Sequence, residues 1–295
     1  MAVLATAEGG GVPFHLHLDV WIIMGGLVVG YVLARRRLGP RLAPPGGPVA
    51  TRRQSWQFAA GMVLFWGFAD WPVHDIAEDS LFFVHMTQHT VFSLVAPALV
   101  IMGTPMWLRQ WLVSPAPVQA VLRRLCRPVP ATLLFNAVVI ITHWPPWVDI
   151  TVQNELAHFA AHVLLVGAAV VMWLPVVGRV PGLPSMSPPG RMLYLFLQSI
   201  VPTVPASFLA FAERPIYEWY ARADRLIGMS AVEDQQVAGA IMKVGGTTIL
   251  WTAIVVMFFR WYQETQREER DVLTWAQVER EMAKSPPRPE PAARP

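Results

Sequence analysis

The sequence has little charge and a single cysteine. Only 15% of its 295 residues are charged, where soluble proteins carry about 25%. Apolar residues make up 54% of the chain and occur in long runs, which excludes an ordinary soluble domain and is typical of a protein that crosses the lipid bilayer. The lone thiol of Cys126 excludes an internal disulfide and a paired-cysteine metal or redox motif.

Common catalytic signatures are also missing. The chain has no H-E-x-x-H zinc-protease motif, and no G-x-S-x-G, Walker A or G-x-G-x-x-G motif in a suitable context. We therefore expect no enzyme and assign no catalytic residue and no organic cofactor site. The net charge is +3, but the basic residues lie in loops in a pattern that topology explains, so we expect no nucleic-acid partner.

Seven apolar segments are candidates for membrane-spanning helices. A span needs about 20 residues at roughly 1.5 Å of rise each. The segments run over residues 16–34, 56–71, 81–102, 130–142, 155–174, 192–212 and 236–259, of which the second and fourth are short. We predict an all-α, seven-transmembrane-helix bundle over 16–262, an extracytoplasmic segment over 1–15 and a charged, proline-rich cytoplasmic tail over 263–295.

The loops divide by charge. The loops after the first, third and fifth segments contain twelve basic residues and no acidic one: Arg35, Arg36, Arg37, Arg41, Arg52, Arg53, Arg109, Arg123, Arg124, Arg127, Arg179 and Arg191. Because positively charged short loops stay in the cytoplasm, the N-terminus is predicted outside and the C-terminus inside. Residues 1–11 hold no basic residue, so we expect no cleaved signal peptide.

Two other residue types bear on the spans. Lys243 falls inside the seventh segment, where it either pairs with an acid or snorkels to the interface. Several tryptophans flank the segments and predict an interfacial belt, namely Trp56, Trp71, Trp107, Trp144, Trp173 and Trp261.

All eight histidines fall at the predicted outer end of the bundle. They are His15, His17, His74, His85, His89, His143, His158 and His162. Two H-x-x-x-H pairs, one in the third segment and one in the fifth, place two imidazoles each on one helix face. Imidazole binds copper, zinc and iron, and helix bundles build metal sites from facing helices. We predict a metal site formed by His85, His89, His158 and His162, then His143 and His74.

Neighbouring residues allow more than one interpretation. Asp70, Asp75 and Glu78 either complete the coordination of a metal, or orient imidazoles through hydrogen bonds, or are ordinary solvated loop acids. Met86 is either core filler or a soft ligand for Cu(I). Single histidines near helix ends are usually interfacial or hydrogen-bonded, and His15 and His17 are given no metal role.

Several short motifs follow one another in chain order between about residues 56 and 259. They are His85-Met-Thr-Gln-His89, Val95-Ala-Pro97, Met102-Gly-Thr-Pro105, Thr142-His143-Trp-Pro145, Asn154 with His158-x-x-x-His162, Trp173-Leu-Pro175, Pro215-Ile-Tyr217 with Tyr220, and Glu233-Asp234-Gln-Gln-Val-Ala-Gly239. Together they resemble the CtaG family of membrane proteins implicated in the assembly of cytochrome c oxidase. The first helix and the tail lie outside the resemblance, and Lys243 stands where the family usually has an apolar residue.

The resemblance implies a seven-helix protein of the bacterial plasma (inner) membrane that matures the oxidase. It implies a part in handling copper, with oxidase subunits and a periplasmic copper donor as partners. We also predict that Asp70, Asp75 and Asp234 orient the ligands. An outer, imidazole-rich site suits delivery of copper to that side of the membrane.

Three alternatives use the same histidines. They could be axial ligands of a membrane haem, which a Soret band would reveal. They could hold the zinc of an intramembrane hydrolase, aided by Asp70 or Asp75. They could also belong to a structural scaffold that binds no metal.

Overall fold

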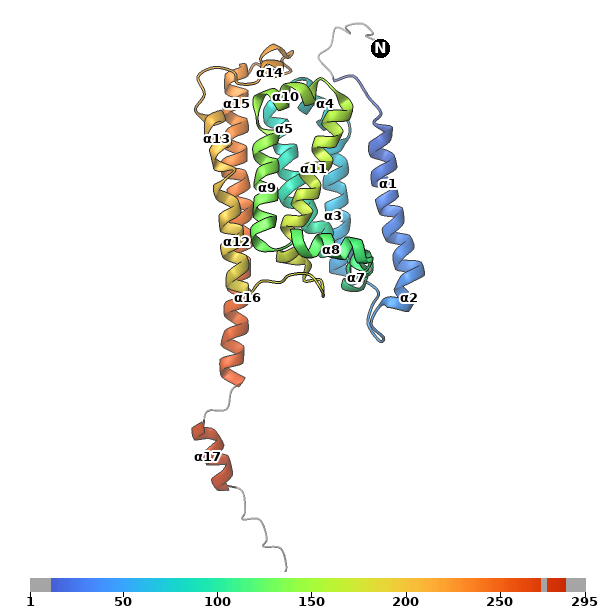
Figure 1. The fold of residues 1–295 in the computed structure, drawn as a ribbon, viewed down its shortest axis with the longest axis vertical. Coiled ribbons are helices and arrows are strands. Elements are labelled where there is room, and N and C mark those ends of the chain that lie inside the picture. The colour runs from blue at the N-terminus through green and yellow to red at the C-terminus, as the bar shows by residue number, and fades with distance from the viewer. Residues whose placement is uncertain (1–11, 272–274, 285–295) are drawn as a thin grey trace, which may run out of the picture.

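The computed structural model describes residues 12–271 and 275–284, and every regular element in these residues is helical (Figure 1). The predicted all-α class is confirmed. In chain order the elements, with π-helical turns marked η, are α1 (Leu18–Leu33), η1 (Ala34–Leu38), α2 (Gly39–Leu42), α3 (Arg52–Ala69), α4 (Val73–Asp79), α5 (Phe82–Thr90), η2 (Val91–Val95), α6 (Ala96–Gly103), α7 (Met106–Val113), α8 (Ala116–Leu125), α9 (Pro128–Thr142), α10 (Pro145–Val152), α11 (Glu155–Trp173), η3 (Leu174–Gly178), α12 (Pro188–Ile200), α13 (Thr203–Ala210), α14 (Glu218–Arg222), α15 (Ala231–Ala240), η4 (Ile241–Gly245), α16 (Gly246–Asp271) and α17 (Trp275–Lys284).

The terminal predictions are only partly covered. Most of the predicted N-terminal segment, with the expected absence of a signal peptide, and the end of the predicted tail lie outside the described residues. Within them, α16 continues to Asp271, past the predicted boundary at 262, and α17 follows as a separate helix.

Five helical stretches are long and apolar enough to cross a membrane. They are Leu18–Leu42, Phe82–Gly103, Glu155–Gly178, Pro188–Ala210 and Ala231–Arg267, and they correspond to the first, third, fifth, sixth and seventh predicted segments. A sixth arises if α8 and α9, bent by 83° at their junction, are one span. α3, the second predicted segment, is 18 residues long but begins with two arginines and a glutamine. The described chain therefore has five candidate spans, or six with the bent pair, and the count of seven stays a prediction.

Side-chain caps explain where several helices begin. Thr51 and Gln54 form a capping box at the start of α3, and Ser230 and Glu233 form another at the start of α15. Asn154 accepts a hydrogen bond from the N–H of Ala157 at the start of α11. Such caps satisfy N–H groups that have no partner inside the helix, so the polar residues between apolar runs set the helix boundaries.

The third span is interrupted by Pro97 and is tied to α11 at that point. Proline lacks an N–H, and its ring pushes aside the carbonyl four residues earlier, which is that of Ser93. The Ser93 carbonyl instead accepts a hydrogen bond from Nε1 of Trp173 at 3.0 Å. Trp173 is 3% exposed and Trp107 is 6% exposed, so the prediction that these two lie in an interfacial belt is wrong.

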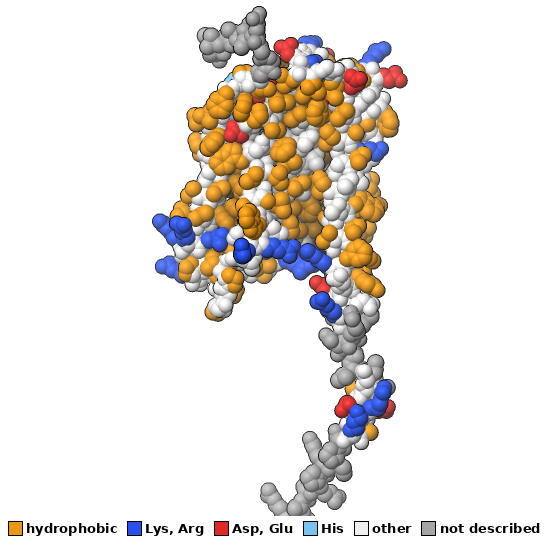
Figure 2. All heavy atoms as spheres, turned by 180° about the vertical axis from the view of Figure 1, so that it is seen from behind, with side chains coloured by type: hydrophobic (Ala, Val, Ile, Leu, Met, Phe, Trp, Pro, Cys, Tyr) orange, Lys and Arg blue, Asp and Glu red, His pale blue; other side chains and the backbone are white. Residues whose placement is uncertain are grey.

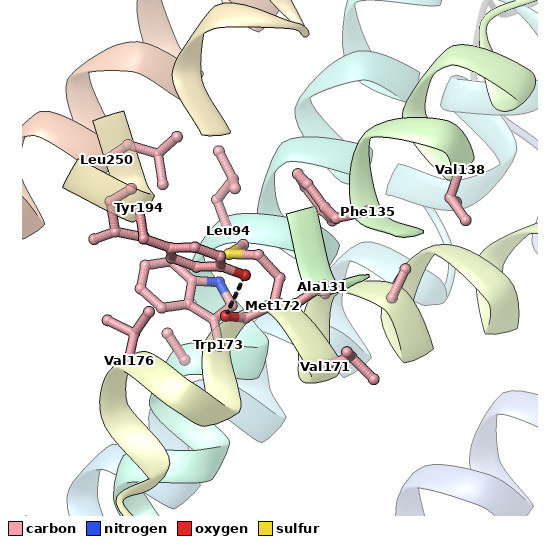
Figure 3. Close-up of a cluster of buried hydrophobic side chains, with 14 of the residues drawn as sticks. Leu94, Ala131, Phe135, Val138, Val171, Met172, Trp173, Val176, Tyr194 and Leu250 are labelled. Atoms are coloured by element: carbon pink, nitrogen blue, oxygen red, sulfur yellow. Dashed lines mark hydrogen bonds between the residues drawn. The ribbon is translucent and has the colours of Figure 1, made fainter. Parts of the chain in front are cut away.

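The central core joins α9, α11 and α12 (Figure 3). Phe135, Met172 and Leu195 are almost fully buried there, and the hydroxyl of Tyr194 donates to the Met172 carbonyl at 3.2 Å. Lipid tails are as apolar as these side chains, so close packing rather than exclusion from water is what holds such helices together.

A glycine brings three further helices together. A Cβ atom at Gly103 of α6 would lie 2.2 Å from the backbone nitrogen of Phe58 in α3, so only glycine fits. The Gly103 carbonyl accepts a hydrogen bond at 3.1 Å from Tyr31 of α1, whose ring stacks on Phe58. α1, α3 and α6 are thereby joined at one point.

Charged side chains gather at the two ends of the bundle. Figure 2 shows a band of lysine and arginine side chains at the end that carries α2, α7 and α8 in Figure 1, with an apolar zone beside it. The opposite end carries α4, α10 and α14, and acidic side chains lie there together with some basic ones. Between the ends, Lys243 donates to Oγ of Ser207 at 3.4 Å and lies 5.8 Å from the ring centre of Phe211.

Candidate metal centre

Helices far apart in the sequence bring histidines to the end of the bundle opposite the arginine band. Each of three helices contributes two side chains that are four residues apart and therefore share one face. These are His74 and Glu78 on α4, His85 and His89 on α5, and His158 and His162 on α11.

The first group, the inner triad, is formed by His85, His89 and His162. One nitrogen from each ring lies within 4.8 Å of the others. Nε2 of His89 is 3.2 Å from Nε2 of His162, and the rings of His85 and His89 are 4.2 Å apart between centres. The Nδ1 atoms of His85 and His89 are buried and have no hydrogen-bond partner. Buried polar atoms are nearly always paired, so unpaired imidazole nitrogens fit a group that binds a ligand.

The second group, the outer triad, is formed by His74, Glu78 and His158. Oε1 of Glu78 lies 3.1 Å from Nε2 of His74 and 2.7 Å from Nε2 of His158. The His158 nitrogen makes no hydrogen bond of good geometry despite this short distance, so we interpret the contact as an ion pair or as two ligands of one ion.

Burial and neighbouring charges shift the pKa values of two side chains of α4, Glu78 and His74. Burial acts to raise the pKa of Glu78, but the short contact with His158 and the charges of His158, His74 and His17 outweigh it, and the pKa is lowered. Burial lowers the pKa of His74, although the charge of Glu78 opposes this. An ionised carboxylate and a neutral imidazole are the forms in which Glu78 and His74 can act as metal ligands.

The two triads adjoin each other. The rings of His158 and His162 are 4.3 Å apart between centres, those of His85 and His158 are 5.7 Å apart, and those of His74 and His162 are 6.2 Å apart. The structure therefore brings five of the six predicted ligands together in a single cluster, split between two sets of ligand atoms.

His143, the sixth predicted ligand, lies beside the cluster but in neither triad. Its Nδ1 is 2.6 Å from the carbonyl of Val139, and its ring is 6.2 Å from that of His89. Its Nε2 is buried without a hydrogen-bond partner. A cavity of about 50 Å³ is lined by His89, His143 and Met86 among others.

The three predicted orienting acids have different partners. Asp75 is 2.7 Å from Nδ1 of His15 and 3.1 Å from Nε2 of His17. Asp70 instead accepts hydrogen bonds from Nε1 of Trp21 at 2.8 Å and from a backbone N–H at 2.9 Å. Asp234 is fully buried and binds the backbone at the start of α5. It therefore acts on the helix that carries the ligands, while Asp75 acts on the two N-terminal histidines.

Gln88 is a functional candidate that sequence reasoning missed. Its amide nitrogen donates to the carbonyl of Phe68 at 2.6 Å and to Nδ1 of His74 at 3.0 Å. Because an amide NH₂ can only donate, Nδ1 of His74 must be the acceptor. The N–H of neutral His74 is then on Nε2, which faces Glu78, and a metal at Nε2 would have to displace this proton. The available signal was its place directly before His89 in the His85-Met-Thr-Gln-His89 motif.

The fold and the cluster together define a class: an all-helical membrane protein with its polar centre, a histidine cluster, at one end of the bundle. The chain belongs to the Caa3_CtaG family of cytochrome c oxidase caa3 assembly factors, because the family model matches residues 29–264. The predicted family is confirmed, and the match begins inside the first helix, which we had placed outside the resemblance.

Two curated proteins are distant relatives of the chain. The chain is 25% identical over 218 residues to an uncharacterised protein of Mycobacterium bovis and, to the same extent, to one of Mycobacterium tuberculosis. Each match covers 64% of this chain but only 31% of the relative, so the chain spans about a third of the length of these proteins. No solved structure matches the chain.

Proposed function

We propose that the chain binds copper at the inner triad and supplies it to cytochrome c oxidase during assembly. The observation that supports this is the convergence of His85, His89 and His162, which bring one ring nitrogen each within 4.8 Å of the others. Copper in this proposal is the cargo of an assembly factor and not a resident cofactor.

The spacing of the nitrogens supports a bare ion. A metal–imidazole bond is about 2.0 Å long, which puts two ligands of a tetrahedral ion about 3.3 Å apart. The 3.2 Å between the Nε2 atoms of His89 and His162 agrees with this value. Three imidazoles leave an open position, as a site that must release its ion requires, and imidazole is a good copper ligand.

The alternatives fit less well. A haem needs a flat slot beside its axial ligand, whereas the rings of His85, His89 and His162 contact one another directly. Zinc could use the same nitrogens, but neither acid expected to aid a hydrolase lies at the inner triad. Asp70 accepts a hydrogen bond from Trp21, and Asp75 contacts His15 and His17. A Soret band would favour the haem, and stoichiometric zinc with turnover of a lipid amide or ester would favour the hydrolase.

In this proposal the chain crosses the bacterial plasma membrane seven times, with its N-terminus outside and its C-terminus in the cytoplasm. The arginine band at one end of the bundle supports it, because positively charged loops remain in the cytoplasm (Figure 2). The histidine cluster would then lie at the outer end, where a periplasmic donor could supply copper.

The test has a biochemical and a cellular part. Purified protein is expected to bind copper, and a variant with His85→Ala and His89→Ala is expected to lose the copper of the inner triad. Thr87→Ala with Thr90→Ala changes two hydroxyls of the same helix and serves as the matched control. In cells, deletion of the gene for this protein should lower the copper content of the oxidase. The threonine control variant should restore that content, and the histidine variant should not. Equal restoration by the histidine variant would contradict the proposal.

A further inference from the structure

The outer triad offers a complete set of metal ligands beside the inner one. It brings one carboxylate oxygen and two imidazole nitrogens within 4.8 Å of one another. Mixed nitrogen and oxygen ligands suit divalent transition ions such as Cu²⁺. None of these atoms belongs to the inner triad, so an ion in each group would not compete for ligands.

Charge favours the outer triad for the first capture of a cation. Glu78 is the only acidic member of either triad, and it lies 26% exposed at the end of the bundle. A carboxylate attracts a cation from water more strongly than neutral imidazoles do, and it offsets repulsion between two neighbouring ions.

Exposure decreases from the surface toward the inner triad. The side chains of His15, His17 and His74 are 58%, 23% and 15% exposed. The ring of His17 lies 4.9 Å from that of His74, and both N-terminal histidines contact Asp75. A series of ligand groups therefore leads from water to His74 and on to the buried cluster.

We propose that the outer triad is a second metal position, which takes a copper ion from the aqueous side and passes it to the inner triad. This inference rests on the proposed function, in which the inner triad binds copper. Transfer is ligand exchange: bonds from the ion to Glu78, His74 and His158 break as bonds to His85, His89 and His162 form, and the ion keeps its oxidation state. His158 and His162, one turn apart on α11, connect the two positions.

A simpler explanation for the short distances is an ion pair between Glu78 and a protonated histidine. The two explanations differ in the number of ions that the protein holds. An ion pair needs no metal and predicts a single copper per chain, whereas the proposal predicts two.

Counting bound copper separates them. The full chain is purified in detergent, treated with excess Cu²⁺, freed of unbound ion by gel filtration and analysed for copper per chain. We expect two ions in the wild type and one in Glu78→Gln, which keeps the shape of the side chain and removes its charge. Asp79→Asn, which removes an exposed carboxylate at the next position, is the matched control and should keep both.

The double variant His85→Ala, His89→Ala distinguishes the failure of each idea. It should keep one ion, in the outer triad. Suppose that the wild type binds one ion, that Glu78→Gln keeps it and that the double variant loses it. This result would overturn the outer position and leave the proposed function intact. If the wild type binds one ion and both Glu78→Gln and the double variant keep it, the outer position and the proposed function are both overturned. A wild type that binds no copper would overturn both as well.

Spectroscopy and kinetics test the transfer itself. Two adjacent Cu²⁺ ions should broaden each other's electron paramagnetic resonance signal in the wild type, and Glu78→Gln should show an unbroadened one. At limiting copper, Glu78→Gln should fill the inner triad at least about tenfold more slowly, since loss of a supporting ligand typically costs that much. Equal filling rates for Glu78→Gln and Asp79→Asn would overturn the transfer role.

Discussion

The carboxylate of Asp234 accepts a hydrogen bond from the backbone N–H of Phe83 at 2.8 Å, although 151 positions separate the two residues. Its other oxygen accepts from the N–H of Phe82 at 2.9 Å and from the guanidinium of Arg225 at 2.6 Å. Asp234 therefore caps the first turn of α5 from α15, and it does so within an ion pair in which Asp234 is 1% and Arg225 20% exposed. This contact fixes the start of α5, and α5 carries His85 and His89 of the inner triad.

Replacing Asp234 should destabilise the protein strongly. Asp234→Ala removes the cap of α5 and leaves Arg225 without its carboxylate, and breaking a buried pair costs about 3–5 kcal/mol. The free energy of unfolding, measured by denaturant titration in detergent, should fall by an amount of that order, and copper binding should weaken with it. Asp224→Ala, in the exposed segment before α15, is the matched control. Equal stability of the two variants would show that the cap is unimportant.

Gln88 should oppose metal binding at the outer triad through His74. Gln88→Leu has a similar volume but cannot donate to Nδ1 of His74, so the ring can carry its proton on Nδ1 and keep the lone pair of Nε2 free for a metal. A hydrogen bond of this kind contributes about 1 kcal/mol. The Cu²⁺ affinity of the outer triad, read from a competition titration, should therefore rise several-fold, while the inner triad is affected less. Thr87→Val, at the preceding position, should leave both affinities unchanged.

The sequence predicts what depends on local pattern. Apolar runs identified the five helical stretches that could span a membrane, and the spacing of four residues placed His85 with His89 and His158 with His162 on common faces. The arginine-rich connection after the third predicted segment was predicted as a loop, yet it forms α7 and α8. The prediction missed them because amphipathic helices have no long apolar run.

Contacts between distant segments could not be predicted. The bond from Asp234 to the start of α5 depends on how α15 packs against it, which no periodicity encodes. Glu78 and Asp75 are three residues apart, and only the course of α4 decides that the first faces the metal ligands and the second faces His15 and His17. The burial of Trp173 likewise follows from the carbonyl that Pro97 leaves without a partner, and not from the position of Trp173 at the end of a span.

The bond from Trp173 to Ser93 should stabilise the bundle without affecting the metal. Trp173→Phe keeps an aromatic ring but leaves the buried Ser93 carbonyl unpaired, which costs about 1–3 kcal/mol. Thermal unfolding in detergent should therefore occur at a lower temperature, with the number of bound copper ions unchanged. Trp56→Phe is the control, since Trp56 is 72% exposed. A loss of copper in Trp173→Phe at full stability would contradict this assignment.

Cys126 should take no part in copper handling. Its side chain is fully buried, and burial raises the pKa of the thiol to about 11. At pH 8 only about one thiol in a thousand is then ionised, and the thiolate is the form that reacts and binds metals. A maleimide should label the native protein very slowly and the denatured protein rapidly, and Cys126→Ala should bind as much copper as the wild type. Rapid native labelling, or lost copper, would reverse this view.

Labelling from one side of the membrane can decide which end of the bundle carries the histidine cluster. In a Cys126→Ala background, Asp224→Cys places a thiol in the exposed segment before α15, at the histidine end, and Pro45→Cys places one in the loop between α2 and α3, at the arginine end. A membrane-impermeant maleimide added to intact cells should label position 224 and spare position 45, and both should react after permeabilisation. This follows because the arginine-rich loops are expected to be retained in the cytoplasm. The reverse pattern would put the triads on the cytoplasmic side, and copper could then not reach them from a periplasmic donor.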